Sequence, residues 1–229
     1  RGLERRDFNM RIGQSELRSG QLFMNIQLPI NANHTFYTFG GYGIRHGNAA
    51  GFYRRPNQNR TSTQIYPNGC LPEIVSDITD VSLAAGIRGK FIGWNYDFSN
   101  TFGHNQFKYG VENTANATQG INSATKFYAG TLGFSQNSIN LDLSKGYDVL
   151  AGLNLAFGAE FRLENYKIKA GDQNSYERFD ITAAPATPTT PANMLPTDFF
   201  GSARPGGSQV FPGFRQENAL SKNRNNVAG

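Results

Sequence analysis

Leu153-Asn154-Leu155-Ala156-Phe157-Gly158-Ala159-Glu160-Phe161-Arg162-Leu163 is the stretch that decides the fold, because large apolar residues alternate in it with small or charged ones. Successive side chains of a β-strand point to opposite faces, so a strand here places every large apolar group on one face. A helix would spread the same groups around its whole circumference. The sequence therefore predicts a strand over residues 153–163 that is apolar on one side only.

Five further segments are predicted as strands. Four of them alternate in the same way, namely residues 22–28, 81–91, 94–102 and 139–143. The fifth, residues 35–45, is aromatic and glycine-rich and alternates less regularly, and a seventh strand is expected to begin near Asn225. Because helical periodicity is almost absent, the fold class is predicted as all-β and antiparallel.

The composition excludes several classes of protein. Only 38% of the residues are apolar, against about 45–50% in an ordinary domain, yet the chain holds 18 Phe and 10 Tyr. No run approaches the roughly 18 apolar residues of a membrane-spanning helix. The net charge of +5 is spread along the chain without the interleaved aromatics of a nucleic-acid groove, so no nucleic acid partner is expected. Strands that are apolar on one face and wet on the other fit this composition.

The connections between the predicted strands alternate strictly in length. Short turns follow residues 28, 91 and 144, whereas the other connections are long, at about residues 46–80, 103–138 and 170–225. Compact soluble domains rarely contain three structureless loops of this size. Outer-membrane β-barrels combine short periplasmic turns with long extracellular loops, because irregular chain must lie outside the bilayer. The pattern therefore favours an antiparallel transmembrane β-barrel segment.

Aromatic residues lie close to the short turns, where a membrane interface is expected. They are Phe36, Tyr37, Trp94, Tyr96 and Tyr147. Amphipathic rings prefer the headgroup region of a bilayer. The alternative is that these rings form the core of a soluble β-sandwich, but a sandwich does not explain the asymmetry of the loops.

Six or seven strands are too few for a single-chain barrel, which needs about eight or more. An open sheet would leave two unpaired edges in lipid. Residues 1–229 are therefore expected to be one partial β-barrel domain, either a fragment or one part of an assembled barrel.

Several segments resemble the barrel region of TonB-dependent receptors. The resemblance lies in Phe36–Tyr42, Ala50–Arg54, Tyr66–Ile74, Gly93–Asp97, Leu153–Arg162, Gln209–Phe214 and Arg224–Ala228, in order along nearly the whole chain. It implies a 22-stranded barrel closed by an N-terminal plug domain and energised by an inner-membrane TonB complex. The plug, the energy-coupling segment and the C-terminal barrel strands of that family are expected to lie outside this chain.

Polar residues opposite the apolar series are predicted to face the barrel lumen. They are Arg88, Lys90, Asp97, Asp142, Glu160 and Arg162. They could hold a plug or line a substrate path. The alternative is that they form a water-exposed inner surface of the barrel, with charge pairs between neighbouring strands and no role in binding.

A second candidate site lies in the first long loop, where aromatic residues stand beside arginines. Its residues are Phe52, Tyr53, Arg54, Arg55 and Tyr66. Such a set could capture a sugar, a siderophore or another large ligand. Equally, these side chains could pack the loops against each other.

Catalysis is not expected. His46 and His104 open long loops at one end of the sheet and could meet a Ser and an Asp, but neither a Gly-x-Ser-x-Gly nor a His-Glu-x-x-His motif is present. Three scattered histidines and the single Cys70 give no metal-ligand spacing, and no cofactor is expected.

The sequence thus predicts part of a receptor that imports a scarce ligand, such as a siderophore, a vitamin or a glycan, across the outer membrane of a Gram-negative bacterium. A passive outer-membrane porin is the first alternative. A barrel enzyme or an adhesin is the second.

Overall fold

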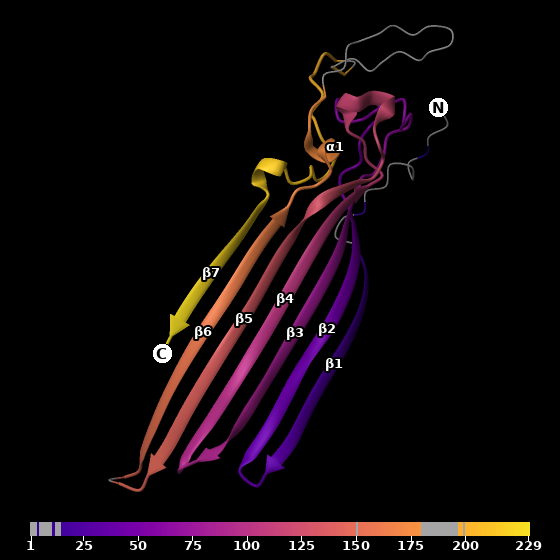
Figure 1. Cartoon of the computed structure of the whole chain (residues 1–229). Coiled ribbons are helices and arrows are strands. Elements are labelled where there is room, and N and C mark those ends of the chain that lie inside the picture. The colour runs from indigo at the N-terminus through magenta and orange to yellow at the C-terminus, as the bar shows by residue number, and fades with distance from the viewer. Residues whose placement is uncertain (1–3, 5–10, 12–14, 150, 180–196, 199) are drawn as a thin grey trace.

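Seven antiparallel strands form a single sheet in which each strand pairs with its neighbours in sequence (Figure 1). The computed structural model describes residues 4, 11, 15–149, 151–179, 197, 198 and 200–229. The strands are β1 (Glu16–Asn31), β2 (His34–Ala50), β3 (Glu73–Phe91), β4 (Trp94–Glu112), β5 (Phe127–Tyr147), β6 (Leu153–Lys169) and β7 (Leu220–Ala228). The predicted all-β, antiparallel class is confirmed.

The strands are longer than the sequence pattern predicted. β1 to β6 have 16 to 21 residues each, and most of the added length lies at the end that carries the long loops. The predicted loops at about 46–80 and 103–138 are therefore too long, since these connections span residues 51–72 and 113–126. The third, predicted at about 170–225, begins at residue 170 as expected but ends at residue 219. In the missed strand ends the apolar residues change to the other face, as Tyr166 and Ile168 do on β6 after Leu163, so the alternation does not continue in phase from the predicted segments.

The three short turns lie together at the opposite end of the sheet (Figure 1). They comprise residues 32–33, 92–93 and 148–152. In the second turn both central residues have positive φ, 49° at Ile92 and 76° at Gly93. This is the conformation of a type I′ turn, whose twist matches that of the flanking strands.

Glycines explain why β2 alternates less regularly than its neighbours. A Cβ atom at Gly40 would lie 2.3 Å from the carbonyl oxygen of Ser82, and one at Gly41 would lie 2.5 Å from the Phe23 ring. Only glycine permits these close approaches. Gly40 and Gly41, which interrupt the alternation of apolar and polar residues in the sequence, are therefore regular members of β2.

Most of the buried residues lie at the loop end of the strands and in the connections, not along the middle of the sheet. Val111, Ala117 and Ala129 are fully buried there, whereas Leu22 and Phe157 of the sheet are 73% and 59% exposed. Short helices η2 (Ala117–Asn122), α1 (Gln173–Tyr176) and η3 (Gln216–Asn218) lie among these connections. None of the helices in the described residues has the length and apolar character that crossing a membrane requires.

The sheet is open. Along the described residues, β1 and β7 each pair with one neighbour, so each leaves one edge without backbone partners. β7 has only 9 residues and ends beside Glu160, part of the way along β6.

Candidate functional site

One face of the sheet carries a continuous belt of large apolar side chains, here called the apolar band. The register aligns the apolar series of the neighbouring strands on this same face, because residues paired across strands point the same way. Its members include Leu22, Met24, Ile26, Leu28, Val81, Leu83, Ile87, Phe98, Phe102, Ile139, Leu141, Leu155, Phe157, Phe161 and Leu163. The expectation that one face collects the apolar groups is confirmed.

The apolar band stops well before the loop end of the strands. On β3 it runs from Phe91 to Val81, and the next residues on that face are Thr79 and Asp77. On β6 it runs from Leu153 to Leu163 and is followed by Asn165. The same face is therefore apolar over its turn-side half and polar over its loop-side half.

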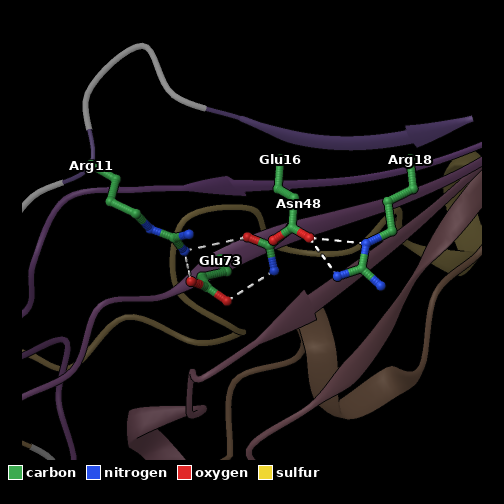
Figure 2. Close-up of polar contacts among 5 residues, drawn as sticks. All are labelled: Arg11, Glu16, Arg18, Asn48 and Glu73. Carbon is green, nitrogen blue, oxygen red and sulfur yellow. Dashed lines mark hydrogen bonds and ion pairs between the residues drawn. The ribbon is translucent and has the colours of Figure 1, made fainter.

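A network of charged side chains marks this polar half on β1 to β3 (Figure 2). Arg11 forms an ion pair with Glu73, and Asn48 donates a hydrogen bond of 3.0 Å to the same carboxylate. Arg18 is 2.7 Å from Glu16. Each arginine in the network thus meets a carboxylate.

The opposite face of the sheet, here called the polar face, carries all six residues predicted to face a lumen. Arg88 pairs with Asp97, and Asp97 pairs with Asp142, so these three point the same way. Glu160 and Arg162 face the same side through Asn140 and Ser138. Lys90 lies two residues beyond Arg88 on β3 and completes the set.

Four of the six surround one hollow near the turn end. Arg88, Lys90, Asp97 and Asp142 line it, and its volume is about 800 Å³. Asp97 accepts a hydrogen bond of 2.7 Å from the Tyr37 hydroxyl, and the Arg88 guanidinium lies 5.3 Å from the centre of the Tyr37 ring. Both signs of charge are present, so the hollow suits a polar or zwitterionic partner.

The remaining two residues form a local ion pair one strand further along. Arg162 lies 2.6 Å from Glu160 and 3.9 Å from Glu164 on the same strand. A similar group joins Arg45, Asp80 and Asn105, with hydrogen bonds of 2.7 Å and 2.6 Å to the Asp80 carboxylate. These pairs match the alternative of a water-exposed surface with charge pairs, whereas the hollow provides room for a ligand or a plug.

The aromatic residues near the short turns divide between the two faces. Phe36, Trp94, Tyr96 and Tyr147 lie on the face of the apolar band, as a membrane interface requires. Tyr37 lies on the polar face instead, where its hydroxyl bonds to Asp97. Adjacent residues of a strand cannot both face one side, so only one of the pair at 36 and 37 can join the band.

The candidate ligand residues of the first long loop do not form a single cluster. Phe52 is 67% exposed and Arg55 is also exposed. Tyr53 donates a hydrogen bond of 2.6 Å to the Asn68 carbonyl within its own loop. Phe52 and Arg55 are therefore the two members that a large ligand can reach directly.

Tyr66 and Arg54 are built into the loop structure. The Tyr66 hydroxyl donates to the Thr114 carbonyl at 3.1 Å, and burial raises the pKa of Tyr66 to about 12. Burial lowers the pKa of the Arg54 guanidinium, and the neighbouring positive charge of Arg60 lowers this pKa further. These two side chains match the alternative reading, in which the loop residues pack the loops together.

Asn116 and Arg204, which the sequence did not single out, tie the three long connections into one cap. The buried Asn116 amide donates to the carbonyls of Asn174 and Glu177 at 2.9 Å and 2.8 Å. The buried Arg204 guanidinium donates to the Thr61 carbonyl at 2.7 Å. These bonds cross 58 to 143 positions of sequence, so no local pattern could have revealed them.

An aromatic cluster holds the third long connection against the polar face. Phe107 and Tyr109 stack with their centres 4.2 Å apart on β4, and they belong to the strand rather than to the predicted loop. The Tyr109 ring lies 5.1 Å from Phe211 and 5.8 Å from Phe214. The segment that carries these two rings therefore folds over the loop end of the polar face.

The two histidines considered for catalysis take separate partners. His46 Nδ1 lies 2.7 Å from Asp77, and His104 Nδ1 lies 2.8 Å from the Ser135 hydroxyl. Asp77 and His104 are offset by four positions along β3, or about 13 Å. Within the described residues, no three His, Cys, Asp or Glu side chains converge as they would around a metal ion.

Comparison with protein-family models, with curated proteins and with solved structures found no match to this chain.

Proposed function

We propose that this chain is part of an outer-membrane β-barrel transporter of the TonB-dependent receptor kind, which imports a scarce ligand such as a siderophore, a vitamin or a glycan. The observation that carries the proposal is the apolar band, which runs across six strands opposite a face that is mostly polar and carries Phe23 and Phe39 on β1 and β2. In water, so large an exposed apolar surface would be strongly unfavourable. In a bilayer it is the expected outer surface of a barrel.

The height of the apolar band supports the proposal. From Leu153 to Leu163 the chain rises through ten residues, or about 34 Å along the strand. With the strand tilt of about 35–45° found in outer-membrane barrels, this corresponds to about 24–28 Å across the bilayer. The apolar belt of such barrels is about 25 Å tall.

The ends of the strands support the same orientation. Short turns at one end and long, mutually bonded connections at the other resemble the periplasmic and extracellular sides of such a barrel. The open edges of β1 and β7 would pair with further strands, since unpaired backbone is untenable in lipid. We propose that these strands belong to a larger, 22-stranded barrel whose plug occupies the polar face.

A quenching experiment tests the membrane orientation. The native protein is reconstituted in vesicles whose lipids carry bromine on the acyl chains, and the emission of Trp94, the only tryptophan in this chain, is isolated with a Trp94→Phe control. Trp94 lies at the turn-side margin of the apolar band, so shallow bromine should quench it more than deep bromine. Emission that no brominated lipid quenches would contradict the membrane placement.

An uptake experiment tests the energised mechanism. Cells that carry the native protein are given ferric siderophores, vitamin B12 or oligosaccharides, with and without a protonophore that collapses the inner-membrane gradient. The proposal predicts uptake of one ligand class that stops when the gradient collapses. Uptake that persists unchanged would exclude an energised receptor.

The aromatic cluster favours one alternative, a passive porin with a loop folded into its lumen. Phe211 and Phe214 hold the third long connection over the polar face, as a constricting loop would be held. The two functions differ in leakage, because a porin passes small sugars without a ligand or a gradient. Swelling of vesicles in small sugars that increases in the double variant Phe211→Ala/Phe214→Ala would support the porin. No swelling with the native protein or with the double variant would exclude it.

A further inference from the structure

A hollow on the loop-side half of the band's face has no role in the proposed transport. Its floor is formed by β5, where Gly133 lies between Gln106 of β4 and Lys167 of β6. A Cβ atom at Gly133 would meet only Lys167, at 3.8 Å and beyond, so the absence of a side chain opens the floor. The hollow measures about 190 Å³, roughly six times the volume share of one water molecule.

The lining of the hollow is cationic and rich in hydrogen-bond donors. It consists of His104, Gln106, Thr131, Gly133, Ser135, Asn165, Lys167 and Lys169, without a carboxylate. Lys167 and Lys169 are exposed, and neither forms an ion pair with a carboxylate of the described residues. The hollow thus differs from the network of Figure 2, in which each arginine meets a carboxylate.

A third lysine flanks the hollow. Lys108 pairs with Thr131, which pairs in turn with Lys169. The Lys108 ammonium lies 5.9 Å from the centre of the Tyr128 ring. Asp77, which stands opposite Lys108 on β3, lies 2.7 Å from His46 instead. Among the described residues, no carboxylate lies within ion-pair distance of Lys108, Lys167 or Lys169.

The apolar band begins directly below the hollow on the same strands. Two residues beyond Ser135 on β5 lies Asn137, with Phe102 on one side and Leu163 on the other. Ile139 and Phe161 follow in the next row. An occupant that extends from the hollow toward the turns therefore meets a cationic, hydrogen-bonding lining first and an apolar surface second.

We propose that this hollow binds the phosphate-bearing headgroup of an anionic lipid in the leaflet on the loop side. Lys167 and Lys169 pair with the phosphate, the Gln106 amide donates to its oxygens, and the acyl chains lie on Phe102 and Leu163. The proposal rests on the membrane placement given above, and it adds a lipid site on the outer surface of the barrel. Paired cations next to an apolar surface match an anionic lipid better than a soluble anion.

The test uses the native protein, purified in a neutral detergent, and phosphatidylglycerol added in mixed micelles. Bound lipid is counted by native mass spectrometry. Each lysine near an anionic lipid contributes roughly fivefold to affinity, so K167Q/K169Q should weaken binding by roughly 30-fold. The matched control K222Q/R224Q removes two cations from the polar face of the neighbouring β7 and should leave binding unchanged.

A second pair of variants separates the shape of the hollow from its charge. Gly133→Phe fills the floor without changing any charge and should also weaken lipid retention. Gly103→Phe is the matched control, because a Cβ at Gly103 meets nothing within 4 Å and this residue lies on the polar face. Equal retention by Gly133→Phe and Gly103→Phe would overturn the proposal.

Two competitors identify the source of the phosphate, and a further readout separates this proposal from the membrane placement. Zwitterionic phosphatidylcholine and inorganic phosphate should not displace the lipid, and displacement by either would overturn an anionic-lipid site. Trp94 quenching is measured in the same variants. If Trp94 is still quenched and K167Q/K169Q binds as much lipid as the native protein, the headgroup site alone is refuted. If Trp94 is not quenched in the native protein, the membrane placement is refuted.

Discussion

Replacing Ala159 by arginine places a charge in the middle of the apolar band. Ala159 is exposed, lies between Phe157 and Phe161 on the same face of β6, and pairs with Leu141. Arginine at the lipid-facing midplane of a β-barrel costs about 2–4 kcal/mol. The equilibrium for folding into a membrane should therefore fall by about 30- to 700-fold.

Ala156→Arg is the matched control, because Ala156 belongs to the same strand but lies on the polar face, paired with Ser144. A charge that faces water should change stability by no more than about 0.5 kcal/mol. A second control, Ala159→Leu, adds volume without charge on the band and should be tolerated.

The assay follows folding of the native polypeptide into phospholipid vesicles across a urea series, with protection from protease as the readout. The account predicts a large shift of the midpoint for Ala159→Arg and a small one for each control. Equal shifts for Ala159→Arg and Ala156→Arg would refute the reasoning, because the two faces would then meet the same solvent.

Three further predictions concern the loop cap and a turn. Asn116→Ala removes the side-chain donor to the Asn174 carbonyl and leaves the Glu177 carbonyl with the Gly207 N–H alone. Local opening of the cap should therefore become easier by about 1–3 kcal/mol. The measurement is amide hydrogen exchange, and exchange rates unchanged across the cap would contradict the assignment. Burial raises the pKa of the Cys70 thiol from 9.0 to about 11. The buried protonated thiol therefore contributes fully to the stability of the folded protein below pH 9. This contribution, roughly 2–3 kcal/mol, is lost as the pH rises through 11. Alkylation of Cys70 in the folded protein should therefore remain slow at pH 8 and rise steeply above pH 10, and rapid labelling at pH 8 would refute its burial. Ile92→Asn should stabilise the turn by about 1 kcal/mol, because a β-branched residue is strained at a φ of 49°. A lower urea midpoint for this variant would show that the isoleucine side chain has a stabilising role of its own.

The sheet itself could be predicted wherever its two faces differ in chemistry. Residues 153–163 alternate without interruption, and the structure aligns them with the apolar series of β1, β3, β4 and β5 on one face. The loop-side halves of the strands could not be predicted in the same way. On β4 the apolar residues Phe107, Tyr109 and Val111 face the side opposite to Phe98 and Phe102, so the alternation reverses within the strand and reads as a break in the sequence.

The candidate sites divide along the same physical line. The side on which Arg88 and Asp97 lie follows from strand parity, so the sequence predicted it and the register reproduces it. The contact of Tyr66 with Thr114, and that of Asn116 with Glu177, depends on how separate loops meet in space. The pattern of a single sequence shows which residues repeat along a strand, but it does not show which loops touch. The loop residues could therefore be named as candidates, but the sequence could not decide whether they bind a ligand or pack the loops together.

The central claim, that one face of the sheet meets lipid and the other meets water, is tested most directly by scanning β6 with a label. Single cysteines are introduced at each position from 155 to 163 of the native protein, with Cys70 replaced by serine, and each carries a polarity-sensitive fluorophore in phospholipid vesicles. The account predicts an alternation of period two, in which odd positions are quenched by nitroxides on the acyl chains and even positions by a water-soluble quencher. Equal access of the water-soluble quencher to odd and even positions would contradict it.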